Sequence, residues 1–506
     1  MKSENTERAR TTPVSNPSGV AALSLRGAGV LAARYGLSTL VNVANMFVLT
    51  WWIGPRAYGL FITAVALTTF LASISRAGLD TYLVRCEEAS DRNLYNTVFT
   101  LTLAISVALM ALGALAAPLL SRWYHDGTVV APYLVLLLTV PMIGLTGPPM
   151  ARLERELRFQ TVATIEFIGQ LLSFLVSGVL AWRGMTVWAP VSGHVAWQVF
   201  TLLAAYLAAG WAPRLRITLP EWRRILNFAV GYSASVRVWQ LRGLVNPLIV
   251  GRVAGAEAVA CVALAIRFAE GLSFVRTAAG RVALAALSRL RGDLVQCRSA
   301  LEKGMRLQVL GLAPLLCGFS LVAPVLLPRL LGHRWEPALQ VFPFVAAAVL
   351  INSVFNLEAS ALFVLGRQWS VTRSYAWHIG LLAAGTLFLV PHLGLAGYGW
   401  AELAACVAYW GLHADLKQVM PFSYGTLGPW LASCCLALLG AAFPGHVTLL
   451  AWMPVAAGCL FWYLHFASSP GFSNSAAITT AATPLAPVLG HARRTTLFRH
   501  AFKFLD

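Results

Sequence analysis

Residues 94–120 read LYNTVFTLTLAISVALMALGALAAPLL and contain no charged residue. A transmembrane helix needs about 20 mostly apolar residues to cross the hydrocarbon core. Similar stretches recur, with short interruptions, from about residue 28 to about residue 467. Over the whole chain 58% of residues are hydrophobic and 11% are charged, whereas about 25% are charged in soluble proteins. The sequence therefore predicts an all-α integral membrane protein without a large soluble domain.

The apolar stretches predict about fourteen transmembrane helices. Six form a first half, at 28–53, 57–78, 94–120, 131–151, 160–182 and 188–210. Six more form a second half, at 225–252, 256–278, 305–332, 338–365, 368–393 and 395–416, and two follow at 425–444 and 447–467. The predicted domains are a polar cytoplasmic tail at 1–25, an N-lobe at 26–210, a cytoplasmic linker at 211–224, a C-lobe at 225–420, two extra helices at 421–468 and a cytoplasmic tail at 469–506.

Basic residues are distributed unevenly among the connections between these helices. Eighteen Lys and Arg residues lie in the even-numbered connections, against six in the odd-numbered ones. Cytoplasmic loops are enriched in Lys and Arg, so the bias places both termini in the cytoplasm. The same rule explains the net charge of +18, because the sequence lacks the clustered basic face of a nucleic-acid-binding protein.

The two halves resemble each other weakly. The first predicted helix ends in Gly54-Pro55 and continues into Gly59-Leu60-Phe61, while the seventh ends in Gly251-Arg252 and continues into Ala260-Cys261-Val262. This alignment requires a four-residue insertion. Because each half has six helices, both halves enter the membrane from the same face. The pattern predicts two lobes related by an axis along the membrane normal, with the substrate site between them.

Short motifs occur in a characteristic order along the chain. They are Ile53-Gly54-Pro55-Arg56-Ala57-Tyr58-Gly59-Leu60-Phe61, Arg76-Ala77-Gly78-Leu79, Leu157-Arg158-Phe159, Gly251-Arg252 with Gly255-Ala256, Gly332 with Trp335 and Ala338, Leu365-Gly366-Arg367, and Gly394 with Gly397. This set covers roughly residues 25 to 420. It resembles the bacterial Wzx-type polysaccharide flippases of the multidrug/oligosaccharidyl-lipid/polysaccharide exporter superfamily.

Two positions depart from the pattern of that family. Asn246 stands where an acidic residue is frequent, and Ala260-Cys261-Val262 stands where the family has Gly-x-Tyr. The first departure argues against a coupling-ion role for Asn246, and neither affects the expected fold.

The resemblance implies that an undecaprenyl-diphosphate-linked oligosaccharide is moved from the cytoplasmic to the periplasmic leaflet of the bacterial inner membrane, for exopolysaccharide, capsule or O-antigen synthesis. It implies two six-helix lobes in a V around a cationic central cavity, with alternating access coupled to an ion gradient. The implied partners are membrane lipid, a polysaccharide polymerase and a chain-length regulator. We expect a monomer with no enzymatic activity, no nucleic acid and no cofactor beyond H+ or Na+ as the coupling ion.

A diphosphate-linked sugar needs buried cations and many polar partners to cross hydrocarbon. Arginine suits phosphate because its charged group is a planar fork. The candidate substrate-binding arginines within predicted helices are Arg34, Arg76, Arg237, Arg242, Arg267 and Arg276. Helical spacing places Arg34 on one face with Ser38, Asn42 and Asn45, and Arg237 with Ser233 and Gln240.

Other roles stay open for these arginines. Long cationic side chains near helix ends reach the lipid headgroups, which is an alternative for Arg34, Arg76, Arg242 and Arg276. Arg267 has Glu270 three residues later, where opposite charges pair along a helix. A structural ion pair is therefore its alternative.

Intramembrane carboxylates are natural ion-coupling sites. The helix at 160–182 has a polar stripe of Glu166, Gln170, Ser173 and Ser177, and the next helix has His194, Gln198 and Thr201. The ion-coupling candidates are Glu166, His194, Glu358 and Glu402, while Gln170 and Ser173 are expected to line the cavity. Glu166 can instead pair with an arginine such as Arg34, and His194 can be a core histidine. The sequence suggests neither a metal cluster nor a catalytic residue.

Two other functions remain open. The same fold can export a peptidoglycan precursor or a small amphipathic drug, and a drug exporter would favour acidic and aromatic cavity residues over several arginines. A membrane glycosyltransferase or polysaccharide polymerase would be expected to carry a long periplasmic loop. The predicted odd-numbered loops are short, which argues against this enzyme class.

Overall fold

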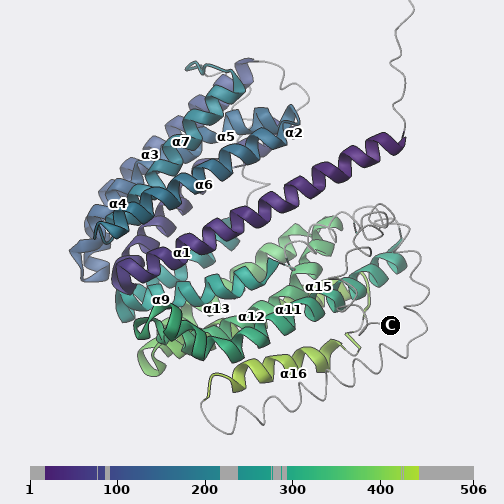
Figure 1. The fold of residues 1–506 in the computed structure, drawn as a ribbon. Coiled ribbons are helices and arrows are strands. Elements are labelled where there is room, and N and C mark those ends of the chain that lie inside the picture. The colour runs from purple at the N-terminus through teal and green to yellow at the C-terminus, as the bar shows by residue number, and fades with distance from the viewer. Residues whose placement is uncertain are drawn as a thin grey trace, which may run out of the picture. The chain divides into compact units, whose positions relative to one another are not determined.

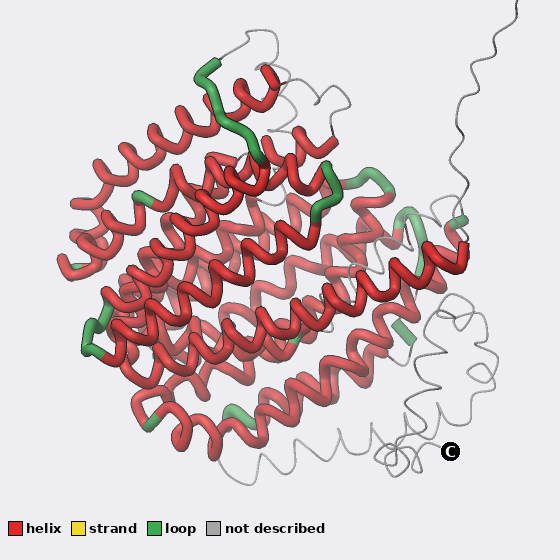
Figure 2. Tube along the Cα trace, turned by 45° about the horizontal axis from the view of Figure 1, so that its top comes forward, coloured by secondary structure: helices red, strands yellow, loops and turns green. Residues whose placement is uncertain are grey.

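The computed structural model describes residues 17–76, 78–85, 92–216, 237–274, 276, 287, 293–422, 424–425 and 427–443. The chain divides into two compact units, one of residues 1–40 with 459–506 and one of residues 41–458. All contacts given below lie in the second unit. Within the described residues the regular structure is entirely helical (Figure 2).

The first half of the chain is a series of helices. They are α1 (Pro17–Arg76), α2 (Leu79–Arg85), α3 (Arg92–Tyr124), η1 (Gly127–Val129), α4 (Val130–Leu137), α5 (Thr139–Arg155), α6 (Phe159–Trp182) and α7 (Trp188–Ala209). α5 contacts α2, α3, α4, α6 and α7, and α6 packs along α7 (Figure 1). α5 is therefore the central helix of this group.

The second half begins with a helical segment at 237–245, which continues as the π-helix η2 (Asn246–Val250) and then as α9 (Gly251–Leu272). The following elements are α11 (Leu294–Leu331), η3 (His333–Trp335), α12 (Pro337–Val364), α13 (Gln368–Leu393), α14 (Leu395–Ala405), η4 (Cys406–Ala408), α15 (Tyr409–Lys417) and α16 (Leu427–Gly440). α12 contacts α9, α11, α13, α14, α15 and α16 (Figure 1). In its most apolar window 72% of residues are buried, against 17% in α3. A helix that is apolar and buried all round occupies the core of its group, as α12 does.

Nine helices of the described part are long and apolar enough to cross a membrane. This confirms the prediction of an all-α membrane protein. The total of fourteen stays a prediction, because the last predicted helix, at 447–467, lies outside the described residues. Two boundaries between predicted helices, the one between 28–53 and 57–78 and the one between 225–252 and 256–278, fall inside continuous helical stretches of the described residues, at 17–76 and 237–272, and each stretch contains a kink.

The two kinks have the same backbone geometry. Gly54 in α1 has φ 75° and ψ 168°, and Gly255 in α9 has φ 82° and ψ 178°. A positive φ of this kind is open almost only to glycine. An offset of 201 residues relates Gly54 to Gly255 and also relates Gly59 to Ala260. The alignment of Gly54 with Gly251 was therefore wrong, and the repeat needs no four-residue insertion.

A second pair of equivalent turns joins α5 to α6 and α12 to α13. Leu157 and Gly366 both adopt the left-handed region, with φ of 57° and 76°. The next residue donates its N–H to the carbonyl five residues back in each turn, over 2.9 Å from Arg158 and 2.8 Å from Arg367. The same backbone conformation at equivalent places supports the internal repeat more directly than the weak sequence similarity does.

Hydrogen bonds join the end of α3 to the start of α9. Trp123 Nε1 donates to the carbonyl of Leu248 over 2.7 Å, and the Tyr124 hydroxyl donates to the carbonyl of Pro247. Arg252 Nη1 in turn donates to the carbonyl of Trp123 over 2.7 Å. A π-helix widens the spacing of backbone hydrogen bonds, and both carbonyls that accept from α3 belong to η2. The first and second halves are thus tied together at this point.

Candidate functional site

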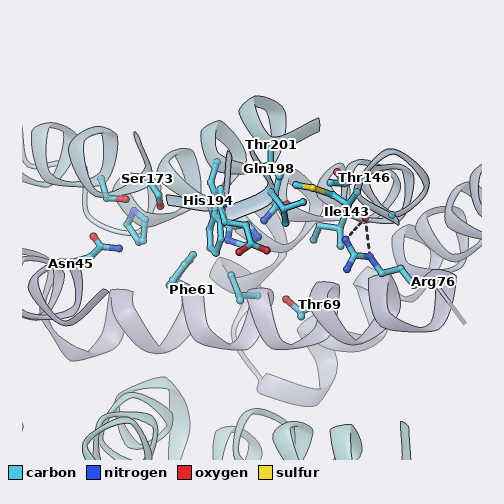
Figure 3. A pocket seen from close by; sticks show the side chains of 18 of the residues that line it. Asn45, Phe61, Thr69, Arg76, Ile143, Thr146, Ser173, His194, Gln198 and Thr201 are labelled. Carbon is cyan, nitrogen blue, oxygen red and sulfur yellow. Dashed lines mark hydrogen bonds between the residues drawn. The ribbon is translucent and has the colours of Figure 1, made fainter. Parts of the chain in front are cut away.

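A cavity of about 550 Å³ lies in the first half, with walls supplied by α1, α2, α5, α6 and α7. Figure 3 shows α1 along one side, with Asn45 near one end and Arg76 near the other, and Ser173 and His194 opposite. Among the described residues that line the cavity, only Arg267 comes from the second half, on α9. A volume of ~300–1,000 Å³ is usual for a small-molecule site.

The α6 wall of the cavity carries the polar stripe expected from the sequence. Ser173 and Ser177 follow Glu166 by seven and eleven residues, so all three share one face of the helix. α6 and α7 can approach closely here because α7 has a glycine at 193, where a Cβ would lie 1.9 Å from the Ser177 Oγ. Gln170 belongs to the same stripe, yet it is not among the lining residues.

The α7 wall combines polar and aromatic groups. His194, Gln198 and Thr201 line the cavity together with Trp197. The His194 ring centroid lies 6.5 Å from that of Phe61 and 5.9 Å from that of Trp197. Its Nε2 atom is buried without a hydrogen-bond partner among the described residues. Ring faces beside amide and hydroxyl groups suit a ligand with apolar faces and hydroxyl edges, such as a sugar.

One end of the cavity has an anchored arginine and two acids. Arg76 donates from Nε and Nη2 to the carbonyl of Ile143, over 3.1 and 2.9 Å (Figure 3). Its Nε also lies 3.7 Å from Asp80 Oδ2. Burial raises the pKa of the Asp80 carboxyl, Arg76 opposes this, and Glu154 adds to the rise. The Asp80 Oδ1 atom has no hydrogen-bond partner among the described residues, so this end holds a carboxyl group able to take up a proton.

Arg267 is the cavity's cation from the second half. Its guanidinium carbon lies 5.7 Å from the centroid of the Tyr58 ring. Arg267 and Glu270 form no ion pair within 4.0 Å, since none is found between these two described residues. The exposed Arg267 side chain is therefore available to a phosphate in the cavity.

Other predicted site residues lie in the second half away from this cavity. Arg242 donates to Glu402 in a buried ion pair, with side-chain exposures of 16% and 3%. Arg276 donates to the Asn352 amide oxygen over 3.1 Å. Glu358 accepts from the Tyr424 hydroxyl over 2.7 Å. None of these four candidates (Arg242, Arg276, Glu358, Glu402) is among the described residues that line the cavity.

Among the remaining predicted residues, the two that the structure describes are not brought to the cavity. Arg237 and Gln240 belong to the helical segment at 237–245 and are not lining residues. Ser233 lies outside the described residues, and so do the side chains of Arg34, Ser38 and Asn42, which α1 carries.

Sequence reasoning missed several residues of the cavity. Asp80 and Glu154 were assigned to loops next to predicted helices that end at 78 and 151. Trp197 was not predicted at the site, and Tyr58 entered the sequence argument only as part of the motif at 53–61. Asp80 and Glu154 belong to different helices, α2 and α5, and their meeting at one end of the cavity cannot be read from spacing along either helix.

Residues 48–340 match the sequence profile of a family described as polysaccharide biosynthesis protein, which is more than half of the chain. The chain belongs to this family. The resemblance to Wzx-type polysaccharide transporters found in the sequence is thereby confirmed.

Three curated relatives of this family member share low identity over long alignments. The succinoglycan biosynthesis transport protein ExoT of Rhizobium meliloti (strain 1021) is 24% identical over 375 residues, covering 70% of this chain and 74% of that protein. The lipopolysaccharide biosynthesis protein WzxC of Escherichia coli (strain K12) is 22% identical over 358 residues, covering 68% and 72%. The teichuronic acid biosynthesis protein TuaB of Bacillus subtilis (strain 168) is 22% identical over 318 residues, and the chain spans 65% of its length.

Two solved structures share the fold. The lipid II flippase MurJ in an inward closed conformation matches with a TM-score of 0.68 at 11% identity, over 86% of this chain and 98% of that one. An inward-facing multidrug resistance MATE family transporter of the MOP superfamily matches with a TM-score of 0.59 at 16% identity, over 75% and 96%. The chain therefore has the fold of a multi-pass membrane transporter.

Proposed function

We propose that this protein moves an undecaprenyl-diphosphate-linked oligosaccharide from the cytoplasmic to the periplasmic leaflet of the inner membrane, by alternating access coupled to an ion gradient. The product would serve exopolysaccharide, capsule or O-antigen synthesis beside a polymerase and a chain-length regulator. The proposal includes two lobes at 26–210 and 225–420 and cytoplasmic termini. The observation that carries it is the cavity of the first half, where sugar-compatible walls lie beside Arg267 of the second half, an arginine with no ion-pair partner among the residues that the structure describes.

The chemistry of the cavity suits such a substrate. A diphosphate needs a cation that is not already neutralised, and Arg267 faces the cavity without an ion pair to the described residues. The sugar needs donors and acceptors spread over a wall, which Ser173, His194 and Gln198 supply. Because Arg267 comes from α9 while these groups come from α6 and α7, one ligand would contact both halves.

The first prediction concerns Arg267. A hydrogen bond to a charged group contributes about 1.5–3 kcal/mol, so Arg267→Ala should reduce flipping by roughly ten- to one-hundred-fold. Arg267→Lys should keep part of it, because the charge remains while the bidentate fork is lost. The measurement is leaflet-resolved labelling of a polyprenyl-diphosphate oligosaccharide in proteoliposomes.

The matched control is Arg183→Ala, which removes an exposed arginine at the end of α6. This control should flip like the wild type. Undiminished flipping by Arg267→Ala at a matched protein level would contradict the assignment.

One observation favours export of a cationic amphipathic molecule as the second candidate. The described lining contains three carboxylates, Asp80, Glu154 and Glu166, and two arginines, Arg76 and Arg267. Acidic and aromatic walls are expected of a drug exporter. Energised efflux of a cationic dye, together with no movement of the lipid-linked probe by the wild-type protein, would favour this candidate over the flippase.

A further inference from the structure

A second polar site is buried in the second half, apart from the cavity described above. Three side chains meet there: Arg242 of the 237–245 segment, His378 of α13 and Glu402 of α14. The exposed fractions of the His378 and Glu402 side chains are 1% and 3%. Buried ionisable groups in a membrane are costly and mark ion or proton pathways unless they are fully paired.

These side chains are not fully paired. Arg242 Nη2 donates to Glu402 Oε1, but three atoms of the cluster are buried without a hydrogen-bond partner in the part of the chain that the structure describes: Arg242 Nε, His378 Nε2 and Glu402 Oε2. An unsatisfied buried polar atom costs free energy, and few exist in a native structure. Three in one cluster therefore call for a ligand that could satisfy some of them.

The tautomer of His378 identifies the ligand. Its Nδ1 atom lies 3.0 Å from the carbonyl oxygen of Ala405. A carbonyl can only accept, so Nδ1 carries the hydrogen and the neutral ring has its lone pair at Nε2. That lone pair faces Glu402 Oε1 over 3.9 Å. Two acceptors face each other, and a proton bound to Nε2 would turn them into a donor and an acceptor.

We propose that His378 and Glu402 form a proton-binding site, with Arg242 as the resident counter-ion of Glu402. The proton comes from a hydronium ion: its O–H bond breaks and leaves a water molecule, while an N–H bond forms at the lone pair of Nε2. A sodium ion fits the site less well, because the Glu402 carboxylate that would bind it is already paired with the permanently charged Arg242 guanidinium. The idea that the site couples transport to a proton gradient rests on the function proposed above.

Aromatic, polar and charged side chains from several helices surround the site. The rings of Trp239 and Tyr409 lie 5.8 and 5.0 Å from that of His378. Tyr409 accepts from Asn352, which accepts from Arg276. The titratable or charged groups that act on Glu402 or Arg242 are Arg276, Tyr398, Cys406 and Tyr409. Glu270 and Tyr375 act in turn on members of this group.

The site is linked to the contact between the two halves. Arg242 lies four residues before η2, and the carbonyls of Pro247 and Leu248 in η2 accept hydrogen bonds from Tyr124 and Trp123 of α3. A charged His378 would compete with Arg242 for the Glu402 carboxylate and so weaken the ion pair between Arg242 and Glu402. The element that would respond is the segment that joins the halves.

The direct test is nitrogen NMR of the full-length protein in nanodiscs, with 15N-labelled histidine. One of the ten histidines should be neutral with its hydrogen on Nδ1 at pH 8 and doubly protonated at pH 5. His378→Gln should remove this signal, whereas His392→Gln, on an exposed residue of the same helix, should leave it unchanged. Glu402→Gln should leave the signal neutral at pH 5.

Several outcomes would overturn the proposal. They are a His378 ring with its hydrogen on Nε2, a ring with no change between pH 8 and pH 5, or a signal that responds to Na+ instead. If Glu402→Gln fails to accumulate, Arg242→Gln/Glu402→Gln removes both charges of the pair and gives the same comparison. A wild-type protein that shows the titration but moves no lipid-linked probe would refute the proposed function and leave the proton site standing.

Discussion

Gly59 lies at a close approach of α1 to α9. A Cβ at this position would be 1.8 Å from the carbonyl oxygen of Ala256, far inside contact distance. The backbone of Ala256 cannot move away freely, because it directly follows the Gly255 kink. The absence of a side chain at residue 59 is therefore what allows α1 and α9 to touch.

Gly59→Ala should destabilise the protein by about 1–3 kcal/mol, the usual cost of overpacking. The measurement is the midpoint of thermal unfolding in detergent. Gly243→Ala is the matched control, since a Cβ there meets no atom within 4 Å and alanine favours the helix. Equal midpoints for Gly59→Ala and the wild type would show that the α1–α9 crossing is looser than described.

Individual site residues were predictable where the spacing along a single helix is enough to place them on one face. The stripe of Glu166 and Ser173 follows from helical spacing alone, and both line the cavity. Spacing along one helix does not reveal which other helix it faces. Arg242 and Glu402 are 160 residues apart, so their pairing could not be read from the sequence, and Arg242 was expected at the substrate site instead.

At the scale of the element, the turns after α5 and α12 repeat one backbone design with different residues. Gly366 adopts its positive φ freely, whereas Leu157 adopts the same region with a side chain that is 75% exposed. The left-handed conformation costs a residue with a Cβ about 1–2 kcal/mol. Because Leu157 is mostly exposed, burial of its side chain offsets little of this conformational cost.

Leu157→Gly should therefore stabilise the protein by about 0.5–1 kcal/mol, after the extra entropy of glycine in the unfolded chain is subtracted. Gly366→Ala should destabilise it by about 1 kcal/mol or more, through backbone strain alone, because a Cβ there meets no atom within 4 Å. Urea unfolding of the detergent-solubilised variants measures both. Changes of the same sign in the two variants would refute the equivalence of the turns.

Element boundaries were predictable from apolar stretches, but their connections were not. Gly54-Pro55 predicts a break between two helices, and a kinked continuous helix is what forms. A single glycine with positive φ redirects the chain while hydrogen bonds continue on both sides, and proline at the first position of the next helix loses no bond that would otherwise form. Composition cannot distinguish such a kink from a loop.

At the scale of the whole molecule, the first and second halves meet through a shared buried apolar cluster and a few directed contacts. Trp335 of η3 donates to the Thr50 carbonyl of α1 over 3.1 Å, and its ring lies edge-on to Tyr58 at 5.9 Å. Arg252 of α9 lies over the Trp123 ring of α3 at 4.8 Å. On the predicted topology this end faces the periplasm. A transporter that opens there has to break these contacts.

Arg252 is the residue whose removal should weaken this end most selectively. Its guanidinium donates to the Trp123 carbonyl over 2.7 Å, lies 2.8 Å from His125 Nε2 and covers the Trp123 ring. Arg252→Ala removes all three interactions and leaves the apolar packing of α1 with η3 in place. A cation over a ring contributes about 0.5–1 kcal/mol at an exposed site, and the hydrogen bonds to the charged group contribute more. The population with this end open should therefore rise several-fold.

Electron-electron double resonance between spin labels measures that population. The labels are introduced as unnatural amino acids at Arg122 and Arg334, two exposed positions near the end of α3 and in η3. Arg252→Ala should add a component at longer distance, while Arg329→Ala, an exposed arginine of α11, should reproduce the wild-type distribution. An unchanged distribution in Arg252→Ala would mean that the buried contacts of Trp335 and Gly59 hold the halves together by themselves. Arg252 would then contribute nothing measurable to an interface that apolar packing already closes.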